Sequence, residues 1–252
     1  MFSPYYAWAG RRRPTDHVAI NVALYAQQGN RWSMTERGEA DLHRTARHFQ
    51  VGPSSLAWEG QSLVVTFDEM GLPRPPSQFL PERIRGTIRL VPDCPGAAPM
   101  ALDAAGRHHW WPVAPSARIS LTMASGAHPN WEGHGYSDSN WGSEPLEEGF
   151  SQWHWSRVRL QNGDAAVLYD MEPWQGPGRS LALRFGQEGP VALDPHPLCR
   201  LPGGFWGVAR QGACASGAAP KIVRTFEDGP FYVRSLMETT VCGERVCGTH
   251  ET

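Results

Sequence analysis

The chain has 252 residues, which is long enough for one large all-β domain or for two small domains. Its 23 Lys and Arg residues nearly balance its 25 Asp and Glu residues, and the net charge of −2 gives no electrostatic basis for a nucleic-acid partner. No window approaches the roughly 18 apolar residues that a spanning helix needs, so the sequence predicts no transmembrane helix.

The N-terminus and the cysteines indicate the compartment. The opening MFSPYYAWAGRRRP does not resemble a secretory signal, because no basic region precedes its apolar part and Pro4 interrupts the apolar run. Five cysteines, an odd number without paired metal-type spacing, predict reduced thiols in a cytoplasmic protein. Cys242 and Cys247 could meet across a hairpin, but two small core residues are favoured, since free cysteine is among the most buried residue types.

Short alternating or β-branched runs recur along the chain, and 27 glycines and 22 prolines mark turns between them. Many short strands at regular spacing predict an all-β fold, either a sandwich or a barrel, and closure into a barrel removes exposed sheet edges. Residues 35–49 have some helical character without a firm apolar face, and their assignment stays open. The predicted strands lie at residues 17–25, 62–70, 84–91, 117–123, 165–171, 180–185 and 221–226.

The number of strands favours two small barrels over one, although the sequence shows no internal repeat. The strand pattern is interrupted near residues 139–150, where glycine, proline and a short acidic run occur together. We therefore expect an N-terminal barrel over residues 1–143 and a C-terminal barrel over residues 144–252.

The clearest predicted hairpin lies at residues 153–170. Asn162-Gly163 is typical of a two-residue type I′ turn, in which both residues have positive φ. One strand carries Trp153, Trp155, Val158 and Leu160, and its partner carries Ala166, Leu168 and Asp170.

Aromatic and histidine side chains gather between residues 108 and 155. An aromatic-rich β core would account for most of the chain's 11 tryptophans, but large rings with one polar group also suit a long apolar ligand. The gathering comprises Trp110, Trp111, Trp131, Trp141, Trp153, Trp155, His108, His109, His134, His154, Tyr136 and Asp138.

This cluster of aromatic and histidine residues could serve several kinds of site. A zinc site could use His108, His109 and His134, but adjacent histidines on a strand point to opposite faces and no zinc-type spacing is present. The sequence also lacks the G-x-S-x-G, G-x-G-x-x-G and Walker motifs. A cofactor-free acid remains, and Asp138 suits it because desolvation among aromatic rings would keep the carboxyl protonated. Turn capping in a Gly/Ser/Asn loop is the alternative role of Asp138.

Long segments of the chain resemble one known family. FSPYYAWA, NVALY, VGPSSLAWEG, RIRGTIRL, WWPVAPSARI, GYSDSNWGSEPLEEGF and VLYD are similar, in collinear order, to segments of the carotenoid 1,2-hydratases of phototrophic bacteria, also called hydroxyneurosporene synthases. The resemblance covers nearly the whole chain. It implies two tandem lipocalin-like (calycin) antiparallel β-barrels and a cofactor-independent hydro-lyase, which adds water across the terminal double bond of acyclic carotenoids such as neurosporene and lycopene.

The resemblance also implies an active site without metal or cofactor. The family pattern is His-x-Trp followed, 25 residues after the Trp, by Tyr-x-Asp; here it matches His109, Trp111, Tyr136 and Asp138. The doubled HHWW leaves a second register through His108 and Trp110, and the following Pro112 favours the first. The chain also stops at GTHET where relatives usually continue, so the second barrel is expected to be incompletely closed or closed by another element.

The resemblance further suggests a role for each site residue. Asp138 would protonate the alkene, and Trp111 and Tyr136 would stabilise the tertiary carbocation with their π faces. His109 would position or deprotonate water, or alternatively tune Asp138 by a hydrogen bond. The partners expected are the carotenoid and water, with no obligate protein partner. Peripheral membrane contact is also expected, with Arg11 to Arg13 as candidate contacts for anionic headgroups. A non-catalytic lipocalin-like carrier, or a related enzyme on another terpenoid, is the alternative.

Overall fold

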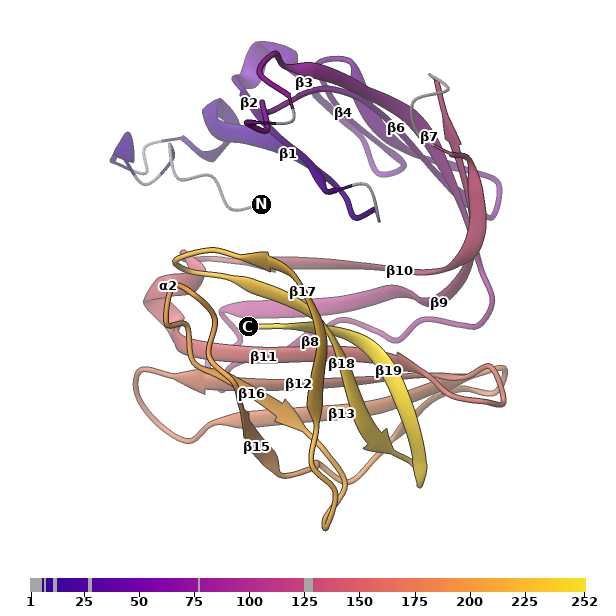
Figure 1. The fold of residues 1–252 in the computed structure, drawn as a ribbon, viewed down its shortest axis with the longest axis vertical. Helices are drawn as coiled ribbons and strands as arrows, with labels where there is room; N and C mark the ends of the chain where they lie inside the picture. The colour runs from indigo at the N-terminus through magenta and orange to yellow at the C-terminus, as the bar shows by residue number, and fades with distance from the viewer. Residues whose placement is uncertain (1–5, 7, 11–12, 27–28, 77, 125–128) are drawn as a thin grey trace. The chain divides into compact units, whose positions relative to one another are not determined.

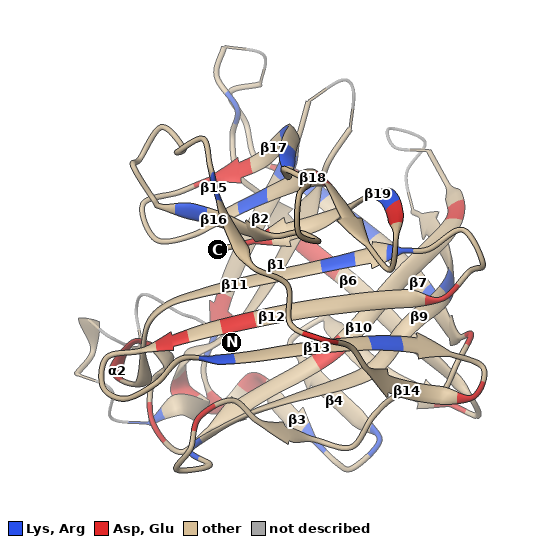
Figure 2. Cartoon of the chain, turned by 90° about the horizontal axis from the view of Figure 1, so that it is seen from below, with Lys and Arg blue, Asp and Glu red and all other residues tan. Residues whose placement is uncertain are grey.

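The computed structural model describes residues 6, 8–10, 13–26, 29–76, 78–124 and 129–252. The chain divides into two compact units, Met1–Val91 with Arg118–His134, and Pro92–Ala117 with Gly135–Thr252. Strands dominate both units (Figure 1), and basic and acidic residues are interspersed along them (Figure 2). Among the described residues, no helix has the length and apolar character needed to cross a membrane.

The first unit is an antiparallel meander with a separate hairpin. Strands β3 to β7 pair in chain order, and the same sheet continues to the long strands β9 and β10. Strands β1 and β2 form the hairpin, and a core of Phe67, Ile84, Leu121 and Met123 packs against β1 residues Val22 and Leu24. The elements are η1(Pro14–His17), β1(Val18–Leu24), β2(Arg31–Arg37), η2(Glu39–Asp41), β3(Leu42–Arg44), β4(His48–Val51), β5(Ser54–Glu59), β6(Ser62–Gly71) and β7(Glu82–Pro92).

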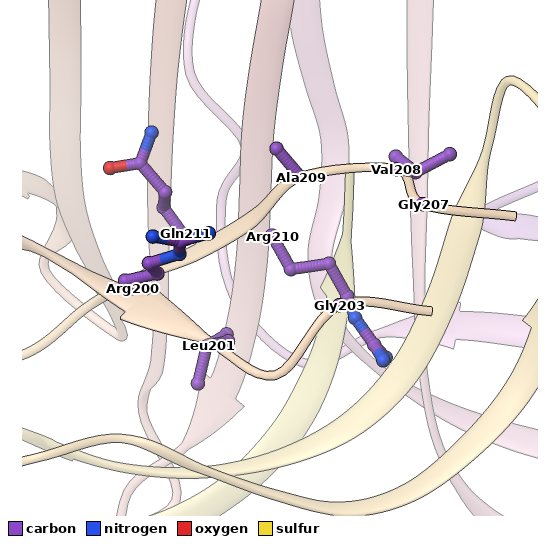
Figure 3. A pocket seen from close by; sticks show the side chains of 8 residues that line it. All are labelled: Arg200, Leu201, Gly203, Gly207, Val208, Ala209, Arg210 and Gln211. Atoms are coloured by element: carbon purple, nitrogen blue, oxygen red, sulfur yellow. The ribbon is translucent and has the colours of Figure 1, made fainter. Parts of the chain in front are cut away.

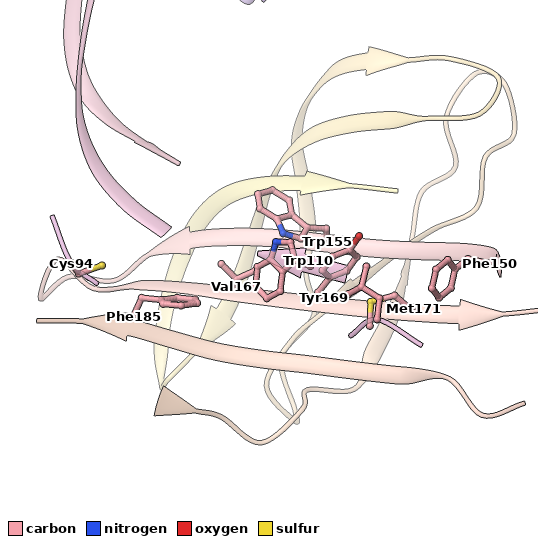
Figure 4. Close-up of a cluster of buried hydrophobic side chains, with 9 residues drawn as sticks. Cys94, Trp110, Phe150, Trp155, Val167, Tyr169, Met171 and Phe185 are labelled. Carbon is pink, nitrogen blue, oxygen red and sulfur yellow. The ribbon is translucent and has the colours of Figure 1, made fainter. Parts of the chain in front are cut away.

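The second unit contains a seven-stranded antiparallel sheet in the order β14-β13-β12-β11-β19-β18-β17 and a two-stranded sheet of β15 and β16. Figure 4 shows part of its main core, where large rings and aliphatic side chains of β9, β11, β12 and β13 pack together. The remaining elements of the chain are β8(Met100–Ala101), β9(His108–Met123), β10(Trp131–Gly142), α2(Leu146–Gly149), β11(Phe150–Arg159), β12(Ala165–Pro173), β13(Arg179–Gly186), β14(Gly189–Ala192), β15(Leu198–Leu201), β16(Arg210–Ala213), β17(Lys221–Asp228), β18(Val233–Val241) and β19(Glu244–Glu251).

The prediction of an all-β chain of two antiparallel, lipocalin-like units is confirmed. Residues 35–49, whose assignment the sequence left open, form a short 3₁₀ turn and strands of the first unit. The two compact units interleave along the chain instead of following one another. The second unit includes 92–117 and 135–143, which lie before the predicted boundary between residues 143 and 144, because β9 and β10 are long strands with one part in each unit.

The hairpin of β11 and β12 is confirmed, but the predicted turn is wrong. Of the two residues proposed for a type I′ turn, only Gly163 has positive φ, at 94°. The strands instead close through a hydrogen bond from Leu160 N to Asp164 O, with a three-residue loop between them. The Asn162 side chain accepts a hydrogen bond from Asp164 N at 3.0 Å, which stabilises this longer turn.

A turn with two positive φ values occurs elsewhere, between β18 and β19. Val241 pairs with Glu244, and the two residues between them, Cys242 and Gly243, have φ of 51° and 78°. Cys242 and Cys247 are free thiols and both are exposed, so the favoured interpretation of two core residues was wrong. The turn geometry places Cys242 at the end of a hairpin, where no core is available to bury it.

Candidate active site

Three side chains of the second unit form a closed hydrogen-bonded triangle. Trp110 lies on β9 and is fully buried, while Tyr136 and Asp138 lie two residues apart on β10 and therefore share one face of that strand. Trp110 Nε1 donates to Asp138 Oδ2 at 2.9 Å and to Tyr136 Oη at 3.0 Å. Tyr136 Oη donates to the same carboxyl oxygen at 2.8 Å.

The surroundings of Asp138 favour its neutral form. Burial raises the pKa of the carboxyl above its ordinary value, and this outweighs the opposing effect of hydrogen bonds from Tyr136 and Trp110. Burial and the nearby Asp138 also raise the pKa of the Tyr136 phenol well above its ordinary value, so Tyr136 stays a hydrogen-bond donor. The hydrogen-bond partners of the Asp138 carboxyl thus carry no charge, and its pKa is shifted toward the protonated form.

Aromatic rings surround the triangle. The Tyr136 ring lies 5.1 Å from that of Trp155, and the Trp110 ring lies 5.6 Å edge-on from that of Tyr169. Trp153 in turn packs against Tyr169 at 6.2 Å. Figure 4 shows Trp110, Trp155 and Tyr169 gathered in this core. Such rings offer negatively polarised faces to a cation in a site with little water.

The structure brings Tyr136 and Asp138 together with Trp110, and not with Trp111. Alternation along β9 buries Trp110 and leaves the Trp111 side chain 40% exposed. His109 lies on the same face as Trp111, and its ring stacks on Trp141 at 5.3 Å. The geometry therefore favours the alternative register for the tryptophan, which the doubled HHWW had left open.

The two adjacent histidines have different surroundings. His108 is buried, and its Nδ1 lies 3.0 Å from Asp103 Oδ2. His109 lines a small cavity of about 120 Å³, whose other lining residues include Asn140 and Tyr169. Within the described part of the chain, neither histidine makes a hydrogen bond to Asp138. His109 is thus close to the site's wall without contacting the acid.

Sequence reasoning did not select Tyr169 or Glu251. Tyr169 lies opposite Trp155 in the β11–β12 pairing, so the register of that hairpin would have found it. Glu251 is a second carboxyl whose pKa burial raises, with Arg234 Nε at 2.8 Å, and its charge interacts with that of Asp138. No pattern in the sequence indicated Glu251, because it comes close to the site only through the pairing of β11 with β19.

The described residues contain no group of three or more His, Cys, Asp or Glu side chains placed to hold a metal ion. Of the histidines considered for a zinc site, His134 belongs to the first unit and His108 belongs to the second. Chemically, the triangle of Trp110, Tyr136 and Asp138 can supply a proton from a buried acid and then stabilise the resulting carboxylate with two hydrogen bonds.

Comparison with known proteins identifies the family. Residues 1–252 match the family described as Carotenoid hydratase CrtC. The chain is 44% identical to the acyclic carotenoid 1,2-hydratase of Thiocapsa roseopersicina and 40% identical to that of Rubrivivax gelatinosus, in both cases over 100% of this chain. It is 37% identical to the Cereibacter sphaeroides protein of the same name and covers 87% of that protein.

The matches also show how much of each relative this chain covers, and which solved structure shares its fold. The chain spans 61% and 62% of the length of the Thiocapsa and Rubrivivax relatives. The crystal structure of an AttH protein from Nitrosomonas europaea superposes with a TM-score of 0.63 at 14% identity, covering 92% of this chain and 78% of that one. At that identity the likeness shows the fold alone. Because the family match extends over the whole chain, the protein belongs to the carotenoid hydratase CrtC family.

Proposed function

We propose that this protein adds water across the terminal 1,2 double bond of an acyclic carotenoid such as neurosporene or lycopene. Family membership and the names of the relatives support a carotenoid as substrate. The observation that carries the proposal is Asp138, a partly buried acid with a raised pKa among aromatic rings. A site for hydrating an unactivated alkene needs such a proton donor, because the reaction begins by protonation of carbon.

In the first step Asp138 transfers its proton to C2 of the terminal double bond, and the π electrons form the new C–H bond. Trp110, Tyr136 and, at 3.4 Å, Asn140 all donate to Oδ2. These donors favour Oδ2 as the carbonyl oxygen and leave Oδ1 to carry the acidic proton. After transfer, the same donors stabilise the carboxylate, which makes Asp138 a stronger acid than burial alone would allow.

Protonation at C2 leaves a tertiary carbocation at C1, which the aromatic rings stabilise. The rings grouped around the acid are those of Trp110, Tyr136, Trp155 and Tyr169. A desolvated cation–π contact contributes about 2 kcal/mol, which is more than a tenfold change in rate. A charged counter-ion in place of these rings would instead hold Asp138 ionised and unable to donate.

Water then captures the cation at C1. The cavity at His109, with a volume of about 120 Å³, has room for a few water molecules. His109 accepts the proton that the attacking water loses, and return of a proton to Asp138 completes the cycle. Every step uses side chains and water, so removal of metal ions with a chelator should leave the activity unchanged.

The test is product analysis in heavy water. The full chain, dialysed against a chelator, is incubated with neurosporene or lycopene in D₂O. The proposal expects a tertiary alcohol at C1 with one deuterium at C2. Carotenoid that remains bound but unchanged would favour the alternative of a non-catalytic carrier. Activity that depends on added zinc would instead favour a metal site.

We also propose peripheral contact with a membrane, since a carotenoid dissolves only in lipid. Of the three arginines expected to contribute, Arg11 and Arg12 lie outside the described residues. Arg13 forms ion pairs with Glu39 and Asp16, which leaves it less available to headgroups. Cosedimentation with anionic liposomes at low salt tests this contact, and a protein that stays in the supernatant under these conditions would contradict it.

A further inference from the structure

Arg210 is a buried cation in the second unit, and the described residues give it no acidic partner. It lies on β16 and only 5% of the residue is exposed. Its Nη1 donates to Thr225 Oγ1 at 3.1 Å and to Ser235 Oγ at 3.2 Å. Nε is buried without a hydrogen-bond acceptor, and Nη2 donates to no residue that the structure describes. Three of the five N–H groups of the guanidinium thus have no described acceptor.

A buried charge is normally paired, as elsewhere in this chain. In the first unit, Arg37 makes a bidentate contact with the buried Glu69, at 3.0 and 2.8 Å. Across the described residues, no carboxylate lies within ion-pair distance of Arg210. The positive charge still acts on its surroundings, because burial lowers the pKa of His250 and the charge of Arg210 lowers it further. An unpaired buried guanidinium is costly unless an anion compensates it.

Arg210 lines a cavity of about 350 Å³ that can hold such an anion. Figure 3 shows the Arg210 side chain reaching from β16 toward the segment that carries Gly203. A second arginine, Arg200, lines the same cavity. None of the lining residues is acidic: they are Arg200, Leu201, Gly203, Gly207, Val208, Ala209, Arg210 and Gln211. The volume falls within the range of small-molecule sites.

The turn beside the cavity carries exposed aromatic side chains. Phe205 is 88% and Trp206 is 58% exposed, and both lie between the lining residues Gly203 and Gly207. Their rings contact each other edge-on at 5.6 Å. Asp228 Oδ2 accepts a hydrogen bond from Phe205 N at 2.7 Å, which fixes the turn. Apolar surface next to a cationic cavity suits a ligand with an acidic head and an apolar part.

We propose that this cavity binds an oxyanion, the carboxylate or phosphate group of a small ligand, with Arg210 as its counter-ion. The planar guanidinium matches the two oxygens of either group. The site is independent of the Asp138 triangle and of the hydration reaction, since it uses none of the same residues. The oxyanion can belong to free phosphate or to a short amphiphile, and the exposed Phe205 and Trp206 favour the amphiphile.

Isothermal titration calorimetry of the full chain tests the proposal with two probes, inorganic phosphate and octanoate, against chloride at equal ionic strength. Saturable binding of either probe is expected, tighter for octanoate. Binding of phosphate alone would identify a free oxyanion as the ligand, and binding of octanoate alone would identify an amphiphile. If neither probe gives a saturable signal at ~10 mM, the proposal is overturned.

Variants assign the binding to Arg210. Arg210→Gln should abolish binding, and Arg210→Lys, which keeps the charge but loses the planar fork, should weaken it at least about tenfold. Arg200→Gln is the matched control, because it removes the same charge from the exposed side of the same cavity and should change binding less than about threefold. Equal binding by wild type and Arg210→Lys, or a larger loss in Arg200→Gln than in the Arg210 variants, would contradict the assignment.

Discussion

Two carboxyl groups, one in each unit, are shielded from solvent to different degrees and have opposite hydrogen-bond partners. Glu69 of the first unit has a fully buried side chain and accepts two hydrogen bonds from Arg37 and a third, at 2.5 Å, from Ser54 Oγ. Asp138 of the second unit is partly buried, and its partners are a phenol and an indole, at 2.8 and 2.9 Å. The first carboxyl contacts a cation and the second contacts only neutral donors.

This difference distinguishes a carboxylate that stabilises the fold through an ion pair from a carboxyl that can donate a proton. A guanidinium in bidentate contact favours an ionised carboxylate, which cannot donate a proton. Burial among neutral donors raises the pKa of the carboxyl and favours the protonated form that can act as an acid. Burial alone therefore does not identify a proton donor, because the charge of its partners decides the protonation state.

The largest effect is expected for Asp138→Asn. The amide keeps the volume and the acceptor oxygen but has no acidic proton. The rate of hydration should therefore fall by a factor of ~10² to ~10⁴. Product formation from neurosporene or lycopene at equal protein concentration measures the loss, and bound carotenoid should remain near the wild-type level.

Asp170→Asn is the matched control for that experiment. Asp170 is likewise a buried aspartate of the second unit with a pKa raised by burial, but its partner is Ser180 Oγ at 2.5 Å. Its conversion should leave turnover per folded molecule within about twofold of wild type. Near-normal turnover by Asp138→Asn would mean that the proton donor lies elsewhere and that Asp138 has only a structural role.

Glu69→Gln should show the reverse result, a loss of stability with little loss of chemistry. The substitution leaves Arg37 in a partly buried position without its carboxylate, which destabilises a protein by about 3–5 kcal/mol. Urea unfolding measures the change in free energy, and Arg89→Gln, which removes an exposed ion pair with Glu59, provides the control. A Glu69→Gln protein as stable as wild type would show that the ion pair contributes no net stability.

Burial in the second unit also favours the neutral form of histidine, so the stability of the fold should decrease at acidic pH. Burial lowers the pKa of His154 to about 4 from an ordinary value of 6.5. Between these values the unfolded chain binds a proton that the folded chain does not, so stability is lost as pH falls through that window. The difference corresponds to at most ~3 kcal/mol for His154.

Urea unfolding between about pH 4 and pH 7 checks this prediction. His154→Gln should flatten the dependence, whereas His43→Gln, at an exposed position of the first unit, should leave it unchanged. A pH dependence that is identical in wild type and His154→Gln would contradict the neutral, buried state of this histidine.

The contrast between the two carboxyls explains what the sequence could predict. Alternation, turn residues and composition were sufficient for an all-β chain, and Tyr136 and Asp138 share a strand face at any register. Glu69 gave no signal, because its partner Arg37 is 32 residues away and meets it only through the fold. Glu251 escaped prediction for the same reason, with β19 pairing to β11 across most of the second unit.

The wrong turn prediction prevented the sequence from identifying other residues of the site. A two-residue turn at Asn162-Gly163 would place Asp170 opposite Trp155, whereas the longer turn places Tyr169 there. A shift of one residue moves every side chain of a strand to the other face. The predicted turn therefore could not place Tyr169 among the aromatic rings around Asp138, although both strands of the hairpin were predicted correctly.

The smallest predicted effect distinguishes the two tryptophans. Trp110→Phe keeps a buried ring but removes the indole donor to Asp138, a hydrogen bond worth ~1.5 kcal/mol to a carboxylate. Turnover should fall about tenfold. In the wild type, the hydrogen bond from Trp110 lowers the pKa of Asp138. Its removal should raise that pKa, so the carboxyl of the variant should stay protonated to a higher pH. The rate, which declines as pH rises through the pKa of the acid, should accordingly decline at a higher pH than in wild type.

Trp111→Phe is the control within the same pair of residues. Its side chain is 40% exposed and lies on the opposite face of β9, so turnover should change less than about twofold and the pH profile should not move. The two variants remove the same N–H group from adjacent positions, of which only Trp110 is in contact with Asp138. A larger loss in Trp111→Phe, without a shifted profile in Trp110→Phe, would restore the register through His109 and Trp111 and would make the hydrogen-bonded triangle a structural feature alone.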